Sequence, residues 1–299
     1  MMKLTADDEK HFVRDAKGIF IPKVAVKHRD EEYSESGFDS LREMQTRHFW
    51  YCGRHRFLLY ALKRMLGRRR QSSDDALSMI DLGGGCGGWI NYLTTHANNT
   101  NWELALADSS VCALEYAEDF TGPSVKRFQV DMLQLPWKER WDVVFLLDVL
   151  EHIPDHIAAL KQAYQILRPG GLLFVTTPAL QFFWTYNDDL AHHVRRYSRN
   201  DFAALADATG FELCTSRYFM FLLSPLLYLS RLKSPDLRNM NADDIQALLH
   251  QTHRVPSSPV NAVLRSVFNL ETPAGFWMPF PWSTSILGVF QKKNQAVCP

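Results

Sequence analysis

The stretch Asp81-Leu82-Gly83-Gly84-Gly85-Cys86-Gly87-Gly88 decides the fold class, because it stands where an apolar segment gives way to a helical one. Residues 76–80 before it predict a buried strand, and residues 89–93 after it predict the start of a helix. Glycine permits a sharp turn and a close approach of the backbone to a ligand, because it has no Cβ atom. The free N–H groups and positive dipole of a helix start suit an anionic ligand group. The stretch therefore predicts a ligand-binding strand–turn–helix unit.

Two ligand-binding patterns overlap at this turn. The dinucleotide fingerprint G-x-G-x-x-G is formed by Gly83, Gly85 and Gly88. The pattern D-x-G-x-G-x-G, formed by Asp81, Gly83, Gly85 and Gly87, resembles motif I of class I S-adenosylmethionine-dependent methyltransferases. Asp108 ends the next strand-like run and suits both patterns, because an acid at that place binds ribose hydroxyls. The turn alone leaves the two possibilities open.

The segments that follow favour the methyltransferases. Residues 124–130 predict a third strand with Asp131 at its tip, and residues 141–147 form an apolar run typical of a buried parallel strand. The next residues, Asp148–Asp155, resemble motif IV of small-molecule methyltransferases related to the ubiquinone and menaquinone enzymes. Pro169–Gly171 resembles the same family's turn into the fifth strand. A nicotinamide dehydrogenase is not expected to carry both blocks in this order.

This resemblance implies an α/β fold with a doubly wound, seven-stranded mixed sheet, whose last strand lies antiparallel beside strand six. We expect one helix over residues 41–66, and a short apolar run at residues 19–26 without a strand partner in the helical region that follows it. The expected parts are an N-terminal arm and helix (1–75), the methyltransferase core (76–232), a helical insertion (233–282) and a final strand with tail (283–299).

The resemblance also assigns the cofactor site, position by position. Gly83, Gly85 and Gly87 would bring backbone against the methionine part of S-adenosylmethionine, and Asp81 would stabilise its amino group. Asp108 would hold the ribose, and Asp131 with Met132 would contact the adenine. Asp148, at the end of the fourth strand, completes the expected cofactor-binding set. For Asp108 and Asp131, turn formation at a strand end is the alternative.

Candidate catalytic residues follow the fourth and fifth strands. Methyl transfer from a sulfonium needs a base only if the acceptor must lose a proton, and His152 is one candidate. His193 and Tyr197 belong to an H-x-R-R-Y pattern, which resembles methyltransferases of glycan, lipid and secondary-metabolite pathways. For His152 and His193, a packing role is an equally good interpretation. Arg195 and Arg196 either grip an anionic acceptor or bind a lid to acids such as Asp188 and Asp189.

Composition limits the partners. The formal net charge of the 299 residues is zero, which gives no reason to expect nucleic acid binding. The polar N-terminus and the odd count of five cysteines predict a cytoplasmic protein. His and Cys show no zinc-type spacing, so no metal is expected. Pro225 interrupts the apolar residues 218–232, so we expect no transmembrane segment, with peripheral membrane contact as a minority hypothesis.

The sequence therefore predicts a methyltransferase that uses S-adenosylmethionine to methylate a small organic acceptor, with oxygen as the first choice of acceptor atom. The acceptor is expected to be partly apolar or anionic, and the oligomeric state is left open. Two alternatives remain: a nicotinamide-dependent oxidoreductase, and a catalytically silent, methyltransferase-like partner subunit. An intact motif I and both strand-tip acids argue against the silent subunit.

Overall fold

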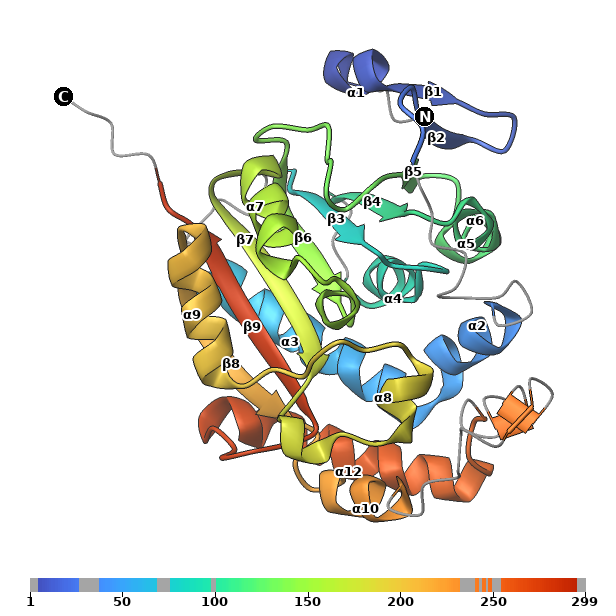
Figure 1. The fold of residues 1–299 in the computed structure, drawn as a ribbon, viewed down its shortest axis with the longest axis vertical. Helices are drawn as coiled ribbons and strands as arrows, with labels where there is room; N and C mark the ends of the chain where they lie inside the picture. The colour runs from blue at the N-terminus through green and yellow to red at the C-terminus, as the bar shows by residue number, and fades with distance from the viewer. Residues whose placement is uncertain are drawn as a thin grey trace.

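A central sheet with helices on both faces dominates the computed structural model (Figure 1). The structure describes residues 5–26, 38–68, 76–97, 101–231, 240–241, 244–245, 247–248 and 254–294. Seven strands form the core of the sheet: β3 (Ser78–Leu82), β4 (Glu103–Asp108), β5 (Lys126–Gln129), β6 (Trp141–Leu147), β7 (Leu167–Pro178), β8 (Phe211–Phe219) and β9 (Ser285–Lys292). They lie in the order β5-β4-β3-β6-β7-β9-β8. The first five are parallel, and β9 is antiparallel to both β7 and β8, which confirms the mixed, doubly wound sheet.

Alternate residues of the core strands pack into two separate apolar layers. On β6, Val143 and Phe145 face one layer, while Val144 and Leu146 face the other. The first layer lies under α3 (Phe49–Arg68), α4 (Gly88–His96) and α12 (Ser258–Trp277). The second lies under α7 (His156–Ile166) and α9 (Arg199–Thr209). Burial on both faces explains why β6 reads as a continuous apolar run.

The single helix expected over residues 41–66 is two helices. α2 (Phe38–Arg47) ends at Arg47, and α3 begins at Phe49 after the single residue His48. The side chain of Asn261 on α12 holds this junction, because its Nδ2 donates to the Arg47 carbonyl at 2.8 Å and its Oδ1 accepts from the Phe49 N–H at 2.9 Å. A tertiary contact from far along the chain thus sets the break, which local periodicity does not reveal.

Within the described part of the chain the sheet has nine strands, not the expected seven. β1 (Phe12–Arg14) and β2 (Ile19–Pro22) form an antiparallel hairpin, and β2 pairs in parallel with β5 at the edge of the core (Figure 1). The apolar run at residues 19–26 therefore finds its strand partner beyond the helical region, in the core itself. The extra hairpin extends the sheet on the side of the third core strand.

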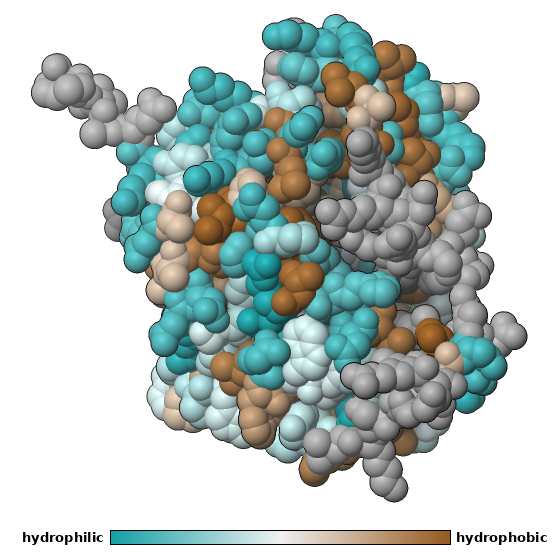
Figure 2. Space-filling view, in the orientation of Figure 1, coloured by the Kyte–Doolittle hydropathy of each residue, from teal (hydrophilic) through white to brown (hydrophobic). Residues whose placement is uncertain are grey.

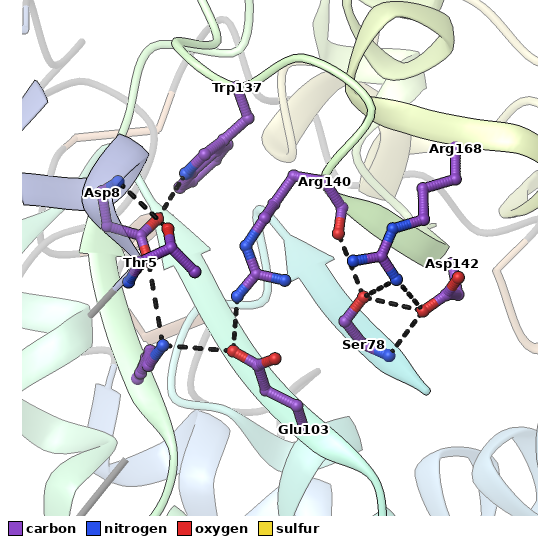
Figure 3. Close-up of polar contacts among 9 residues, drawn as sticks. Thr5, Asp8, Ser78, Glu103, Trp137, Arg140, Asp142 and Arg168 are labelled. Atoms are coloured by element: carbon purple, nitrogen blue, oxygen red, sulfur yellow. Dashed lines mark hydrogen bonds and ion pairs between the residues drawn. The ribbon is translucent and has the colours of Figure 1, made fainter. Parts of the chain in front are cut away.

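A buried polar network joins the N-terminal helix α1 (Ala6–His11) to the core (Figure 3). Asp8 is fully buried and accepts a hydrogen bond of 2.9 Å from Nε1 of Trp137. Nζ of Lys126 lies 3.8 Å from Asp8 and 3.1 Å from Glu103 on β4. Phe12 packs against the Trp137 ring, with a centroid distance of 5.4 Å. These contacts fix α1 and the start of β1 to the core sheet.

Replacing Asp8 by alanine is expected to destabilise the fold by about 1–3 kcal/mol, because the buried Trp137 N–H loses its acceptor. Chemical denaturation followed by far-UV circular dichroism measures the change. Glu9→Ala on the same helix is the matched control, since Glu9 is exposed and a surface substitution is expected to stay within about 0.5 kcal/mol. Equal stability of the two variants would contradict the integral role of the arm.

Of the apolar residues 218–232, the described ones (218–231) comprise the end of β8, a turn and the helix α10 (Ser224–Arg231). No described helix is long and apolar enough to cross a bilayer. Leu222, Leu226 and Leu229 are exposed around α10, as are Leu270 and Trp277 on α12. On the face shown in Figure 2, apolar side chains lie in small groups separated by polar ones. Peripheral membrane contact stays a prediction.

Candidate active site

Four acidic residues stand at or just beyond the carboxyl ends of adjacent core strands. In the spatial order of the strands β5, β4, β3 and β6, these are Asp131, Asp108, Asp81 and Asp148. Ligands of open α/β sheets bind along this edge, where the strand order reverses around the first strand. The topology thus brings the expected cofactor-binding acids to one edge.

The glycine turn closes tightly over the end of β3. The Gly83 N–H donates to the Ala107 carbonyl at 2.7 Å, and Gly83 has a positive φ of 72°. A Cβ atom at Gly83 would lie 2.7 Å from the Val149 side chain. Gly87 is the N-cap of α4 in the left-handed conformation, with φ 79°. Side chains at these two positions would be strained, so the turn keeps bare backbone facing the strand edge.

Asp108 and Asp131 both make local turn contacts. Oδ2 of Asp108 accepts from the Gly85 N–H at 2.9 Å, and Oδ1 accepts from the Ser110 N–H at 2.9 Å. Oδ1 of Asp131 accepts from the Leu133 N–H at 2.8 Å. Met132 lies between Asp131 and Leu133 in the loop after β5 and is half-buried against the core. These contacts support turn formation, and the cofactor roles of the three residues stay predictions.

Asp81 is a buried acid with unused hydrogen-bonding capacity. Its carboxylate atom Oδ1 has no hydrogen-bond partner among the described residues. Burial, with a further contribution from the charge of Asp108, raises the pKa of Asp81 to about 8. A Cβ atom at Gly84 would lie 2.4 Å from its Oδ2, so the glycine leaves room for this carboxylate. The unpaired oxygen is compatible with the expected contact to the amino group of S-adenosylmethionine, and this role of Asp81 stays a prediction.

Asp148 is bound by an arginine from α3. The Arg54 guanidinium forms an ion pair with Asp148, and the Thr176 hydroxyl donates to the second carboxylate oxygen at 3.3 Å. Asp148 adopts a positive φ of 57°. The Arg54 guanidinium also lies over the ring of Trp50, 4.7 Å from its centroid. Arg54 is not among the site residues expected from the sequence, because its partner lies 94 residues further along the chain.

Glu151, His152 and His193 form a compact cluster beyond the end of β6. Glu151 and His152 belong to the 3-10 helix η2 (Leu150–His152), whereas His193 follows α8 (Tyr186–Leu190). The rings of His152 and His193 lie 4.8 Å apart between centroids. One ligand atom from each of the three residues lies within 4.8 Å of the others, so they could hold a metal ion. Sequence spacing missed this group because His193 comes from a separate loop.

His193 is oriented by Asp188, which Arg196 also binds. Nδ1 of His193 lies 2.9 Å from Oδ1 of Asp188, and the Arg196 guanidinium donates to both Asp188 oxygens at 2.8 Å. Burial opposes ionisation, but the hydrogen bonds from His193 and Arg196 hold the pKa of Asp188 well below its usual range. Arg196 thus binds Asp188, whereas Arg195 donates to the Pro154 carbonyl at 2.8 Å.

Burial keeps two members of the cluster, Glu151 and His152, uncharged near neutral pH. Burial raises the pKa of Glu151 to about 8, and neither of its carboxylate oxygens has a hydrogen-bond partner among the described residues. Burial, together with the neighbouring His193 and His192, lowers the pKa of His152 to about 4. A neutral imidazole can accept a proton or bind a metal.

Tyr197, the third predicted catalytic residue, is buried. Its hydroxyl donates to the Leu150 carbonyl at 3.2 Å and lies 2.8 Å from Nδ1 of His156. Burial raises the pKa of Tyr197 above its usual range. These contacts support a role in packing the loop against α7 more than a role as base.

Comparisons with known proteins identify the family of the chain. The model of a family described as a methyltransferase domain matches residues 49–216. The ubiquinone biosynthesis O-methyltransferase of Pseudomonas entomophila is 29% identical over 96 residues, which cover 31% of this chain and 41% of that enzyme. The aligned part thus spans less than half the length of the relative.

Two solved structures share the fold over most of the chain. One is a chain from the complex between the Haloferax volcanii Trm112 methyltransferase activator and a methyltransferase, with a TM-score of 0.54, 15% identity, and coverage of 90% of this chain and 100% of that one. The other is phosphoethanolamine N-methyltransferase 2 of Haemonchus contortus in complex with S-adenosyl-L-methionine. Its TM-score is 0.54 at 18% identity, and the match covers 92% of this chain and 62% of that one.

Proposed function

Because the chain belongs to the methyltransferase-domain family, we propose that it transfers a methyl group from S-adenosylmethionine to an oxygen of a small organic acceptor. The observation that carries the cofactor assignment is Asp81, a buried carboxylate with an unpaired oxygen beside the glycine turn. The choice of oxygen as acceptor atom is supported by the likeness to the ubiquinone O-methyltransferases, which extends over 96 residues.

The donor half of the site lies along β3, β4 and β5. Gly83, Gly85 and Gly87 would leave backbone open to the methionine part of the cofactor, and Asp81 would accept from its amino group. Asp108 would bind the ribose hydroxyls, and the Asp131–Met132 loop would contact the adenine. Asp148 would act through its ion pair with Arg54, which fixes the end of β6. When bound, S-adenosylmethionine supplies an already activated methyl group.

The acceptor half of the site is the cluster of Glu151, His152 and His193. It follows β6, so it lies on the same edge of the sheet as the donor half. The protein chiefly has to align the acceptor oxygen, and orientation of this kind can supply about 7–11 kcal/mol of the barrier. His152 and His193 are the groups proposed to act on the acceptor oxygen. Arg196 is already bound to Asp188, which leaves it less suited to grip an anionic acceptor.

Calorimetric titration with S-adenosylhomocysteine and with NADH tests this proposal against its alternatives. We expect micromolar binding of S-adenosylhomocysteine and no binding of NADH. Binding of NADH alone would establish the oxidoreductase instead. Binding of neither ligand would favour the silent partner subunit.

Cofactor binding is expected to depend on pH through Asp81. In the folded protein its pKa is about 8, compared with an ordinary value of 3.8, so its carboxyl is protonated at pH 7. The ionised form is the one that the amino group of the ligand stabilises. Binding below pH 8 therefore releases a proton, and the affinity rises by up to about tenfold for each pH unit towards 8. For the protein without ligand the sign is opposite, because the raised pKa makes the contribution of Asp81 to stability fall between about pH 4 and 8.

Titration at pH 7 in two buffers of different ionisation enthalpy measures the protons released on binding. We expect close to one proton for the unchanged protein and none for Asp81→Asn, whose amide does not titrate. Equal heats in the two buffers for the unchanged protein would show that Asp81 is already ionised or does not contact the ligand.

A further inference from the structure

We propose that Glu151, His152 and His193 form a binding site for one divalent first-row metal ion. Their ligand atoms lie within 4.8 Å of one another, and the Glu151 side chain is fully buried with both oxygens unpartnered among the described residues. Two imidazoles and one carboxylate are a ligand set typical of Zn²⁺, Mn²⁺ or Fe²⁺ sites that keep positions open for another ligand. A buried carboxylate without a partner is costly unless a cation or a proton satisfies it.

The surroundings of both imidazoles match those of metal-binding histidines. Such histidines usually donate their second ring N–H to a carboxylate or a backbone carbonyl, which fixes the ring and its tautomer. Nδ1 of His193 is held by Asp188 at 2.9 Å, which leaves Nε2 as the nitrogen available to a metal. The backbone of Ala191 lies beside the His152 ring and favours its protonated form. The His193 ring is thus already oriented from behind by a carboxylate outside the cluster.

Asp188 is itself fixed from three sides. It accepts from Nε and Nη2 of Arg196 at 2.8 Å each and from the Thr185 N–H at 2.8 Å. Arg196 balances its charge, so Glu151 is the acidic group left to offset the charge of the cation. Asp188 is therefore a positioning residue for His193 and not a ligand.

The role of this metal site, but not its existence, rests on the proposed function, because the site lies in the acceptor half. A cation there would bind and polarise an acceptor oxygen, which lowers the pKa of a bound hydroxyl. In that case His152 and His193 serve as ligands, and neither has to act as a base. A free coordination position on the metal ion would hold the acceptor oxygen and thereby fix the acceptor beside the cofactor.

Titration of the full chain with Co²⁺ and with Zn²⁺, without cofactor or acceptor, tests the site directly. We expect one ion per chain with micromolar affinity, and a visible absorption spectrum of bound Co²⁺ that shows nitrogen and oxygen ligands. Glu151→Gln and His193→Ala are each expected to weaken binding at least about tenfold. Asp188→Asn is expected to weaken it by about 10- to 100-fold and to change the Co²⁺ spectrum, because His193 loses its orientation.

His192→Ala is the matched control, since His192 adjoins His193 in sequence but is exposed and outside the cluster. It should bind Co²⁺ as the unchanged chain does. The proposal is overturned if the unchanged chain binds neither ion, or if His193→Ala binds as tightly as His192→Ala. Binding of S-adenosylhomocysteine by the same samples reports on the methyltransferase proposal independently, because the donor half lies on other strands. Circular dichroism of each variant excludes a loss of folding as the cause.

Discussion

Replacing Asp108 by alanine is expected to weaken the binding of S-adenosylhomocysteine by about 100-fold or more. Hydrogen bonds to a charged group contribute about 1.5–3 kcal/mol each, and two ribose hydroxyls would bind to this carboxylate. The same carboxylate holds the N–H of Gly85 at 2.9 Å, so its loss also loosens the glycine turn. Both effects act in the same direction. Calorimetric titration of the variant measures the loss.

Asp119→Ala is the control for this prediction, because Asp119 is exposed on the short helix α6 (Glu118–Thr121) next to the site. It is expected to bind the ligand as the unchanged chain does. Thermal denaturation of both variants separates a loss of binding from a loss of folding. An affinity of Asp108→Ala within about threefold of the control would mean that Asp108 serves only the turn, as its bonds to Gly85 and Ser110 already allow.

The core of the fold could be predicted because each of its elements carries a local signal. The apolar run of β6 coincides with the expected residues 141–147. The hairpin of β1 and β2 could not be assigned in the same way. Its edge contact with β5 depends on Phe20 stacking on Phe128, with a centroid distance of 5.0 Å, and no periodicity within either segment reports such a pairing.

The site shows the same limit. The glycine turn and each strand-tip acid stand at the end of a predicted strand, and the carboxyl ends of parallel strands share one edge of a sheet. Their common edge could therefore be predicted from the sequence. The cluster with His193 forms because the loop after β7 folds back over η2. A hydrogen bond of 2.9 Å from the Val194 N–H to the Glu151 carbonyl holds the loop there. The expectation of no metal came from spacing along the chain, and spacing cannot register ligands brought together by a loop.

Arg54 connects the two halves of the site. It is buried on α3, forms its ion pair with Asp148 at the end of β6, and its charge also acts on Asp81 and Glu151. Burial, opposed by these neighbouring groups, lowers the pKa of Arg54 from its usual value. Arg54 thus supplies the positive charge shared by Asp81 on β3, Asp148 at the end of β6 and Glu151 on η2.

Arg54→Met is expected to destabilise the protein by about 3–5 kcal/mol at neutral pH, because the partly buried Asp148 is left without its partner. Urea denaturation measures the change, and Arg56→Met, at an exposed position of the same helix, is the control. The double variant Arg54→Met/Asp148→Asn should recover much of the loss, since it removes both charges. If the double variant is as unstable as the sum of its single variants, the contribution of Arg54 comes from packing on Trp50 and not from the ion pair.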